Sequence, residues 1–82
     1  MADTKELKNK VEAILYATGK GVGVEDLAIY CDTKPGQVEK ALHELQEEFS
    51  AREGSLTFSE INGRWKLTVR GKYTTDIQKI VS

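Results

Sequence analysis

The chain has 82 residues, of which 39% are hydrophobic and 30% are charged, and its formal net charge at pH 7 is -1. A chain of this length closes one small core, and its composition lacks the proline, glycine or single-sign charge excess that is typical of disorder. The single cysteine excludes an internal disulfide, and with a single histidine it cannot supply a zinc-binding set.

Two further bulk features set the expected surroundings of the chain. No segment approaches the roughly 18 consecutive apolar residues of a membrane span, and the N-terminal residues are too polar for a secretory signal. We therefore expect a cytoplasmic protein without membrane contact. Residues 1–53 carry 7 Lys and Arg against 11 Asp and Glu, whereas residues 54–82 carry 5 against 2. The first part of the chain is acidic and the last part is basic.

Two amphipathic helices are predicted in the first part of the chain. Residues 5–18 place apolar side chains at helical spacing, and the glycines that follow end this helix, because glycine tolerates positive φ. Val22, between two of these glycines, is expected to make a one-residue strand pairing. A helix of two turns then follows Gly23, which stands at its N-cap. The apolar positions of the two helices are Leu7, Val11, Ile14, Leu15, Leu27, Ala28 and either Tyr30 or Cys31.

The longest predicted helix comes third and runs to about Ala51. The turn before it contains Asp32 and Thr33, whose side-chain oxygens we expect to cap the helix, and Pro35, which is tolerated in a first helical turn. Gly54 ends the helical pattern. The periodicity, which is the clearest in the chain, is carried by Val38, Leu42, Leu45 and Phe49.

Residues 55–71 predict a β-hairpin. Their side chains alternate with period two on both sides of Asn62 and Gly63, the preferred pair for a type I′ turn, and a two-residue turn sets the register. One face of the hairpin is then aliphatic and phenyl, and the other is polar and cationic. Trp65 shares the apolar face near the turn, opposite a glutamate, and we expect it to be incompletely buried. The expected pairs are Ile61 with Arg64, Glu60 with Trp65, Ser59 with Lys66, Phe58 with Leu67, Thr57 with Thr68 and Leu56 with Val69.

The order of these elements predicts the fold. A short closing helix is expected after the hairpin, from Tyr73, Ile77, Ile80 and Val81. Three helices, of which the second and third are joined by a tight turn, followed by a two-stranded wing hairpin, are the order of a winged helix-turn-helix domain. The predicted class is α+β, with a single winged-helix domain over residues 1–82 whose core covers about residues 5–81.

The sequence contains no pattern that predicts catalysis, and we expect no enzymatic activity, cofactor or bound metal. The glycines at 19, 21 and 23 follow a helix and lack the Gly-Lys-Ser/Thr ending of a phosphate-binding loop. His43 lies off the apolar stripe, and no nucleophile is placed to meet it. Cys31 is interpreted as a small core residue, and the glutamates at 44, 47 and 48 as a solvated helix face.

A sequence-specific DNA-binding transcriptional regulator is the alternative function. Winged-helix readers place the long helix in the major groove, where acidic side chains are repelled by phosphate. Here that helix is acidic, and only its N-terminal end, with Lys34, Gln37 and Lys40, suits DNA. The expected contact with nucleic acid, or with an acidic partner, is therefore weak and non-specific, and the residues that suit it are Arg64, Lys66, Arg70 and Lys72.

Four aromatic residues are the predicted protein interface. A tryptophan at the edge of a small domain is a typical interface anchor. Packing of this tryptophan against the closing helix is an equally physical alternative, because periodicity does not separate core from interface positions. The four residues are Tyr16, Tyr30, Trp65 and Tyr73.

Three stretches resemble, in order and spacing, the N-terminal winged-helix domain of the segregation and condensation protein B (ScpB) family. They are "VEAILYATGKGVGVEDLA" (residues 11–28), "VEKALHELQEEF" (38–49) and "LTFSEINGRWKLTVRGKYTTDIQKI" (56–80). The resemblance extends from about Leu7 to Ile80. The three stretches taken in order are more specific for the family than any one of them. This order includes the glycine-bearing turn, the aromatic residue after it, Arg70 and Tyr73.

The resemblance implies a function in chromosome condensation and segregation. Members of the ScpB family are non-enzymatic subunits of a condensin-like complex, associated with the nucleoid in the cytoplasm. Their partners are the kleisin ScpA and, through it, the SMC ATPase. Family members usually carry two winged-helix domains, of which the first is implicated in self-association and the second contributes strongly to kleisin binding; this sequence contains one. The resemblance therefore implies a homodimerising protein-interaction module.

Overall fold

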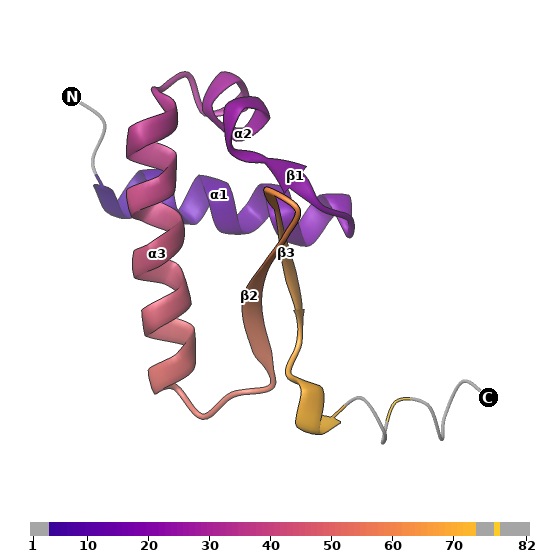
Figure 1. Ribbon diagram of the computed structural model, residues 1–82. Helices are drawn as coiled ribbons and strands as arrows, with labels where there is room; N and C mark the ends of the chain where they lie inside the picture. Colours follow the sequence, from indigo (N-terminus) through magenta and orange to yellow (C-terminus); the bar gives the residue numbers. More distant parts are fainter. Residues whose placement is uncertain (1–3, 74–76, 78–82) are drawn as a thin grey trace.

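The first helix, α1 (Thr4–Thr18), crosses behind the rest of the fold and is held by one apolar stripe (Figure 1). This structure is a computed structural model, and it describes residues 4–73 and residue 77. Leu7, Val11 and Leu15 of α1 are buried, as their helical spacing predicts. The helix is followed by Gly19, whose φ of 64° lies in the left-handed region that glycine tolerates.

A two-residue strand, β1 (Val22–Gly23), leads directly into α2 (Val24–Tyr30). Gly23 is the N-cap of α2 as predicted, with extended backbone and no side-chain hydrogen bond to the helix. Because α2 has only two turns, it buries just Leu27 and Ala28. The opposite side of the helix is left to solvent.

The longest helix, α3 (Pro35–Ala51), begins where the sequence predicts, but its cap differs from the prediction. The N-cap is Lys34, without a side-chain hydrogen bond, so the expected capping by Asp32 and Thr33 is wrong. Their backbone amides instead close the end of α2, since Asp32 N–H donates to the Ile29 carbonyl and Thr33 N–H to that of Ala28. Asp32 adopts a left-handed φ of 54° in this connection, which aspartate tolerates better than most residues.

The hairpin of β2 (Leu56–Ile61) and β3 (Arg64–Val69) has the predicted register at every pair. Asn62 and Gly63 both have positive φ, as a type I′ turn requires. The sheet has a third strand, because β1 pairs with β3 through Val22 and Trp65. The strand order is β1-β3-β2, so the last strand in the chain is the central one. The expected pairing at Val22 is therefore confirmed and extends to Gly23.

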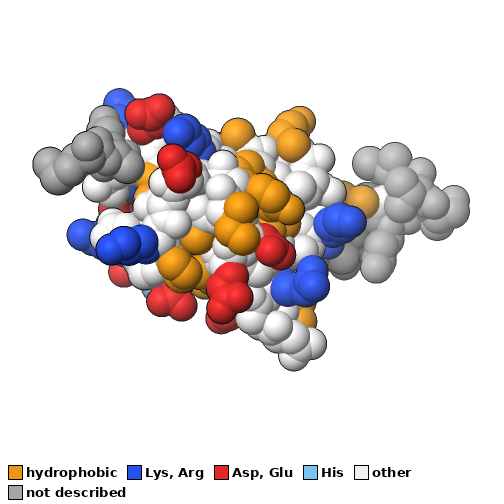
Figure 2. Space-filling view, turned by 90° about the horizontal axis from the view of Figure 1, so that it is seen from above, with side chains coloured by type: hydrophobic (Ala, Val, Ile, Leu, Met, Phe, Trp, Pro, Cys, Tyr) orange, Lys and Arg blue, Asp and Glu red, His pale blue; other side chains and the backbone are white. Residues whose placement is uncertain are grey.

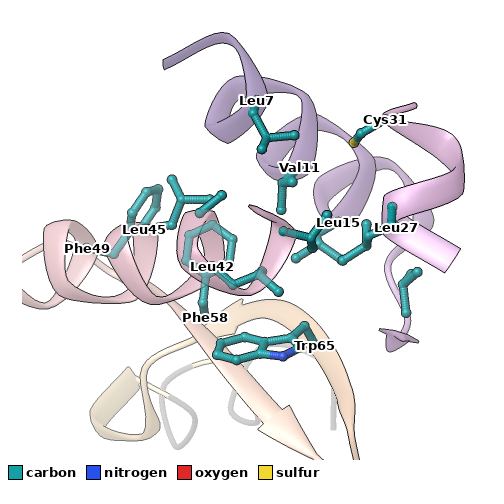
Figure 3. Close-up of a cluster of buried hydrophobic side chains, with 14 residues drawn as sticks. Leu7, Val11, Leu15, Leu27, Cys31, Leu42, Leu45, Phe49, Phe58 and Trp65 are labelled. Carbon is teal, nitrogen blue, oxygen red and sulfur yellow. The ribbon is translucent and has the colours of Figure 1, made fainter. Parts of the chain in front are cut away.

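The core lies where α1 and α3 pack against one face of this sheet (Figure 3). Phe58 from β2 is 1% exposed and meets Phe49 from α3 edge to face, with ring centroids 4.8 Å apart. Trp65 is 4% exposed, so the expectation that it is incompletely buried is wrong. The reason is twofold, because β1 pairs beside it and the His43 ring of α3 meets it edge to face at 5.7 Å.

After Arg70, the residues that the structure describes are helical. A 3-10 turn, η1 (Gly71–Tyr73), follows the hairpin, and Ile77 is helical. Ile80 and Val81, which complete the predicted closing helix, lie outside the described residues. The predicted α+β winged-helix order is confirmed, with β1 as an addition to the two-stranded wing. Within the described residues, none of the helices has the length and apolar character needed to span a membrane.

Candidate protein-interaction site

Large apolar side chains are exposed on the side of α2 that faces away from the core. Ile29 is 73% exposed and Tyr30 is 65% exposed. The view onto the α2 side of the molecule shows hydrophobic side chains gathered at its middle, with charged side chains around them (Figure 2). A cluster of apolar side chains rimmed by polar ones is typical of a surface that binds another protein.

A groove lies between α1 and the hairpin, with a volume of about 400 Å³. It exists because the apolar face of the hairpin extends beyond the area that the helices cover, leaving Leu56 36% exposed and Leu67 half-buried. On the α1 side, Tyr16 is 77% exposed at the margin of the groove. The residues that line the groove are Asn9, Glu12, Ala13, Tyr16, Leu56 and Leu67.

The four cations predicted to contact nucleic acid or an acidic partner do not form one surface. Arg70 is half-buried, and its guanidinium donates to the Phe49 carbonyl near the C-terminal end of α3, where a positive charge is favourable. Arg64 is exposed but donates from Nη1 to the Gly21 carbonyl at 3.2 Å. Lys72 lies 5.2 Å from the centre of the Tyr73 ring. Only Lys66 extends from the outer face of the sheet with no such contact among the described residues.

The acidic character of α3 is partly neutralised from α1. The helix carries four glutamates and one lysine. Lys8 donates to the Glu48 carboxylate and lies 3.7 Å from that of Glu44. The hydrogen bond to Glu48 is the main cause that raises the pKa of Lys8 above its ordinary value. Glu39 and Glu47 remain exposed, so the surface that reads DNA in other winged helices is still acidic.

Cys31 lies at the end of α2 in the core, as predicted, and is 6% exposed. Burial raises the pKa of its thiol, against a smaller lowering by the positive charge of Lys10. A raised pKa keeps the group as the poorly nucleophilic thiol at neutral pH. Within the residues described, no three His, Cys, Asp or Glu side chains are placed to hold a metal ion.

The structure does not bring the four predicted interface aromatics together. Tyr16 lines the groove, Tyr30 is exposed on α2 and Tyr73 is half-buried after the hairpin. Trp65 belongs to the core, because β1 and α3 cover it, and it presents almost no surface to a partner. Ile29 was missed by sequence reasoning, although its place outside the buried stripe of a two-turn helix is a usable signal. The groove was missed because the sequence does not tell how far the helices cover the hairpin.

The family model for the segregation and condensation complex subunit ScpB matches residues 9–82. The chain belongs to the ScpB family. The segregation and condensation protein B of Syntrophotalea carbinolica is 30% identical over 80 residues, which are 98% of this chain and 41% of that protein. That of Alkaliphilus oremlandii is 27% identical over 78 residues, which are 95% of this chain and 42% of that protein. The chain thus spans about two fifths of the length of these curated ScpB relatives.

Two solved ScpB structures share this fold. ScpB from Mycobacterium tuberculosis superimposes with a TM-score of 0.90 at 21% identity, over 99% of this chain and 51% of that one. A dimer of an ScpB N-terminal domain in complex with an ScpA peptide gives a TM-score of 0.85 at 23% identity, over 93% of this chain and 95% of that one. At these identities the likeness is one of fold, and the fold is that of the N-terminal domain of ScpB.

Proposed function

We propose that this chain is a non-enzymatic subunit of a condensin-like complex that condenses and segregates chromosomes. The observation that carries the proposal is the ScpB family match over residues 9–82. In this proposal residues 1–82 form a single winged-helix domain that acts in the cytoplasm, at the nucleoid. Its partners are a second copy of itself, the kleisin ScpA and, through ScpA, the SMC ATPase. The matched dimer of an ScpB N-terminal domain with an ScpA peptide supports these two direct partners.

The exposed side of α2 is the surface that best suits self-association. Ile29 and Tyr30 are neighbours there, and their burial in a dimer removes apolar area from water at about 25 cal/mol per Å². Light scattering across a dilution series tests this. We expect a dimer that dissociates on dilution, and Ile29→Glu is expected to give a monomer at concentrations where the parent chain is dimeric. Ile61→Glu, at a similarly exposed isoleucine on the hairpin, is the matched control. A parent chain that is monomeric at every concentration contradicts the proposal.

A sequence-specific regulator is the competing function, and it makes a different prediction. The N-terminal end of α3 exposes Lys34, Gln37 and Lys40, which suit base or phosphate contacts. The remainder of the helix is acidic, however, and repels the phosphate backbone. We therefore expect only weak, salt-labile binding to DNA in fluorescence anisotropy, indifferent to sequence and made through cations such as Lys66. Tight binding to one operator, relaxed by substitution of Gln37 or Lys40, establishes the regulator instead.

A further inference from the structure

Among the described residues, one edge of the central strand β3 is unpaired from Lys66 to Val69. On one side it pairs with β2 along all six residues of each strand. On the other side β1 is only two residues long and pairs with Arg64 and Trp65 alone. Beyond Trp65, no strand of the described chain lies along this edge.

The register shows which backbone groups face the open edge. The pair that closes a two-residue hairpin exchanges hydrogen bonds, and antiparallel pairs then alternate between bonded and non-bonded. The pairs of Lys66 and Thr68 with β2 are therefore bonded, and the bond from Arg70 N–H to the Ser55 carbonyl, 2.8 Å, continues this alternation. Leu67 and Val69 consequently direct their N–H and C=O groups away from β2. Neither residue has a backbone hydrogen bond on that side within the described chain.

The groove between α1 and the hairpin lies on the apolar face of the same strand. A strand added beside Leu67 places every second side chain on the face that Leu67 occupies. The groove over that face has a volume of about 400 Å³ and is lined by Leu56 and Leu67 from the hairpin and by α1 residues that include Ala13 and Tyr16. Glu12 is half-buried at the margin and has no ion pair within the described residues. The groove therefore suits a peptide strand that has apolar side chains at alternate positions and a positively charged side chain at one end.

We propose that β3 accepts an extended peptide at Leu67 and Val69 by strand addition, with alternate apolar side chains of the peptide in the groove and a Lys or Arg against Glu12. Strand addition to an exposed edge is a recurrent mode of peptide recognition, with affinity from the backbone and specificity from alternate side chains. The inference rests on the proposed function, in which this peptide is a segment of ScpA.

Two observations select this occupant and this edge. The edge offers the backbone groups of only two residues, which is enough to bind a short peptide. A stable dimer buries roughly 800 Å² on each partner, so a second copy of the chain is not the occupant. The other outer edge of the sheet, on β2, is partly occupied, because Gln46 Nε2 donates to the Phe58 carbonyl at 3.1 Å. A peptide that pairs there has to displace this bond.

Amide hydrogen exchange of the full chain tests the proposal. The probe is a set of short overlapping peptides that covers the ScpA of the same organism. At saturation with a bound peptide, we expect exchange of the Leu67 and Val69 amides to slow by about tenfold or more, as for one new hydrogen bond. The Leu56 and Phe58 amides, on the β2 edge, are expected to keep their rates. If exchange slows instead for amides on the β2 edge or on α2, the proposed binding site is wrong, while ScpA is still supported as the partner.

Substitutions give a second, independent readout. Tyr16→Ala is expected to weaken the peptide about tenfold or more, because it removes an aromatic side chain that lines the groove and leaves the charge beside Glu12 unchanged. Ile61→Ala, on the outer face of the hairpin, is the matched control and is expected to leave the affinity unchanged. Val69→Pro removes one edge donor without touching the bonds to β2 and is expected to abolish binding. Equal affinities of the parent chain and Tyr16→Ala overturn the groove, even where Val69→Pro fails to fold. If no ScpA peptide binds at all, the proposed partner fails and this inference fails with it.

Discussion

Phe58 joins the sheet to the helices, and its removal is expected to cost a large part of the stability. Its ring is 1% exposed and meets Phe49 edge to face with centroids 4.8 Å apart. Truncation of a buried Phe to Ala costs about 3–5 kcal/mol, of which an aromatic pair of this geometry accounts for ~0.5–1.5 kcal/mol. At ~0.05–0.15 kcal/mol per residue, the 82 residues have a free energy of unfolding of about 4–12 kcal/mol. Phe58→Ala is therefore expected to remove between about a quarter and all of this free energy.

The assay is urea unfolding, followed by the fluorescence of Trp65 and by far-UV circular dichroism. Trp65 is the single tryptophan and is buried, so its emission reports core opening directly. Ile61→Ala is the matched control, because Ile61 belongs to the same strand but is 68% exposed, and its cost is expected to stay within ~0.5 kcal/mol. A loss below ~1 kcal/mol for Phe58→Ala, in the range of ordinary surface changes, refutes the assignment of Phe58 to the core. An equal loss for Ile61→Ala refutes the orientation of the strand.

Three further predictions concern the backbone and the buried thiol. Gly21→Ala is expected to lower the urea midpoint of unfolding, because the new Cβ meets the Arg64 Cβ at 2.9 Å. Gly36→Ala, which has open space around it in a helix, is expected to raise the free energy of unfolding by ~0.5–1 kcal/mol. The reverse order of the two variants contradicts the packing of β1 on β3. Glu53→Gly is expected to stabilise by up to ~1 kcal/mol, since Glu53 has a φ of 41°; a destabilised variant in the same urea titration counts against this loop conformation. Burial raises the pKa of Cys31, so the stability that the neutral thiol contributes is complete below the ordinary pKa of cysteine and is lost as pH rises through the raised value. Between neutral and alkaline pH, the free energy of unfolding of Cys31→Ala is therefore expected to fall less than that of the parent chain. An equal fall in both proteins contradicts the assignment of this pH dependence to Cys31.

The hairpin was predictable to the residue, because its determinants are local. Asn62 and Gly63 specify the turn type, and the alternation on either side leaves one register that keeps four apolar side chains on one face. These are Leu56, Phe58, Leu67 and Val69. The buried positions of α1 and α3 follow from periodicity for the same reason, since a stripe of apolar side chains faces the core.

The burial of Trp65 was not predictable from the hairpin alone. It depends on β1, which lies far away in the sequence, and on His43 from α3. The cap of α3 was missed for a related reason, because Asp32 and Thr33 close the preceding helix and are no longer available for the next one. In both cases the residue contacts an element other than the one to which the sequence pattern assigned it.

The candidate site was predictable only in part. Tyr16 and Tyr30 are exposed aromatics on helices whose buried stripes are evident, and both were named from the sequence. The groove depends on how far α1 and α3 extend over the sheet, and the open edge depends on β1 stopping after two residues. These are properties of relative placement, which periodicity does not encode.

The strand order has a consequence for synthesis of the chain on the ribosome. Because the middle strand of the sheet is the last of the described strands to be made, the three helices emerge before the sheet that covers one side of them is complete. The side of α1 that packs on β3 stays uncovered until residues 64–69 have left the exit tunnel, and until then the nascent chain is most exposed to proteases and to aggregation with other chains. Closure is therefore a late, long-range event in which the final strand completes both the sheet and the core.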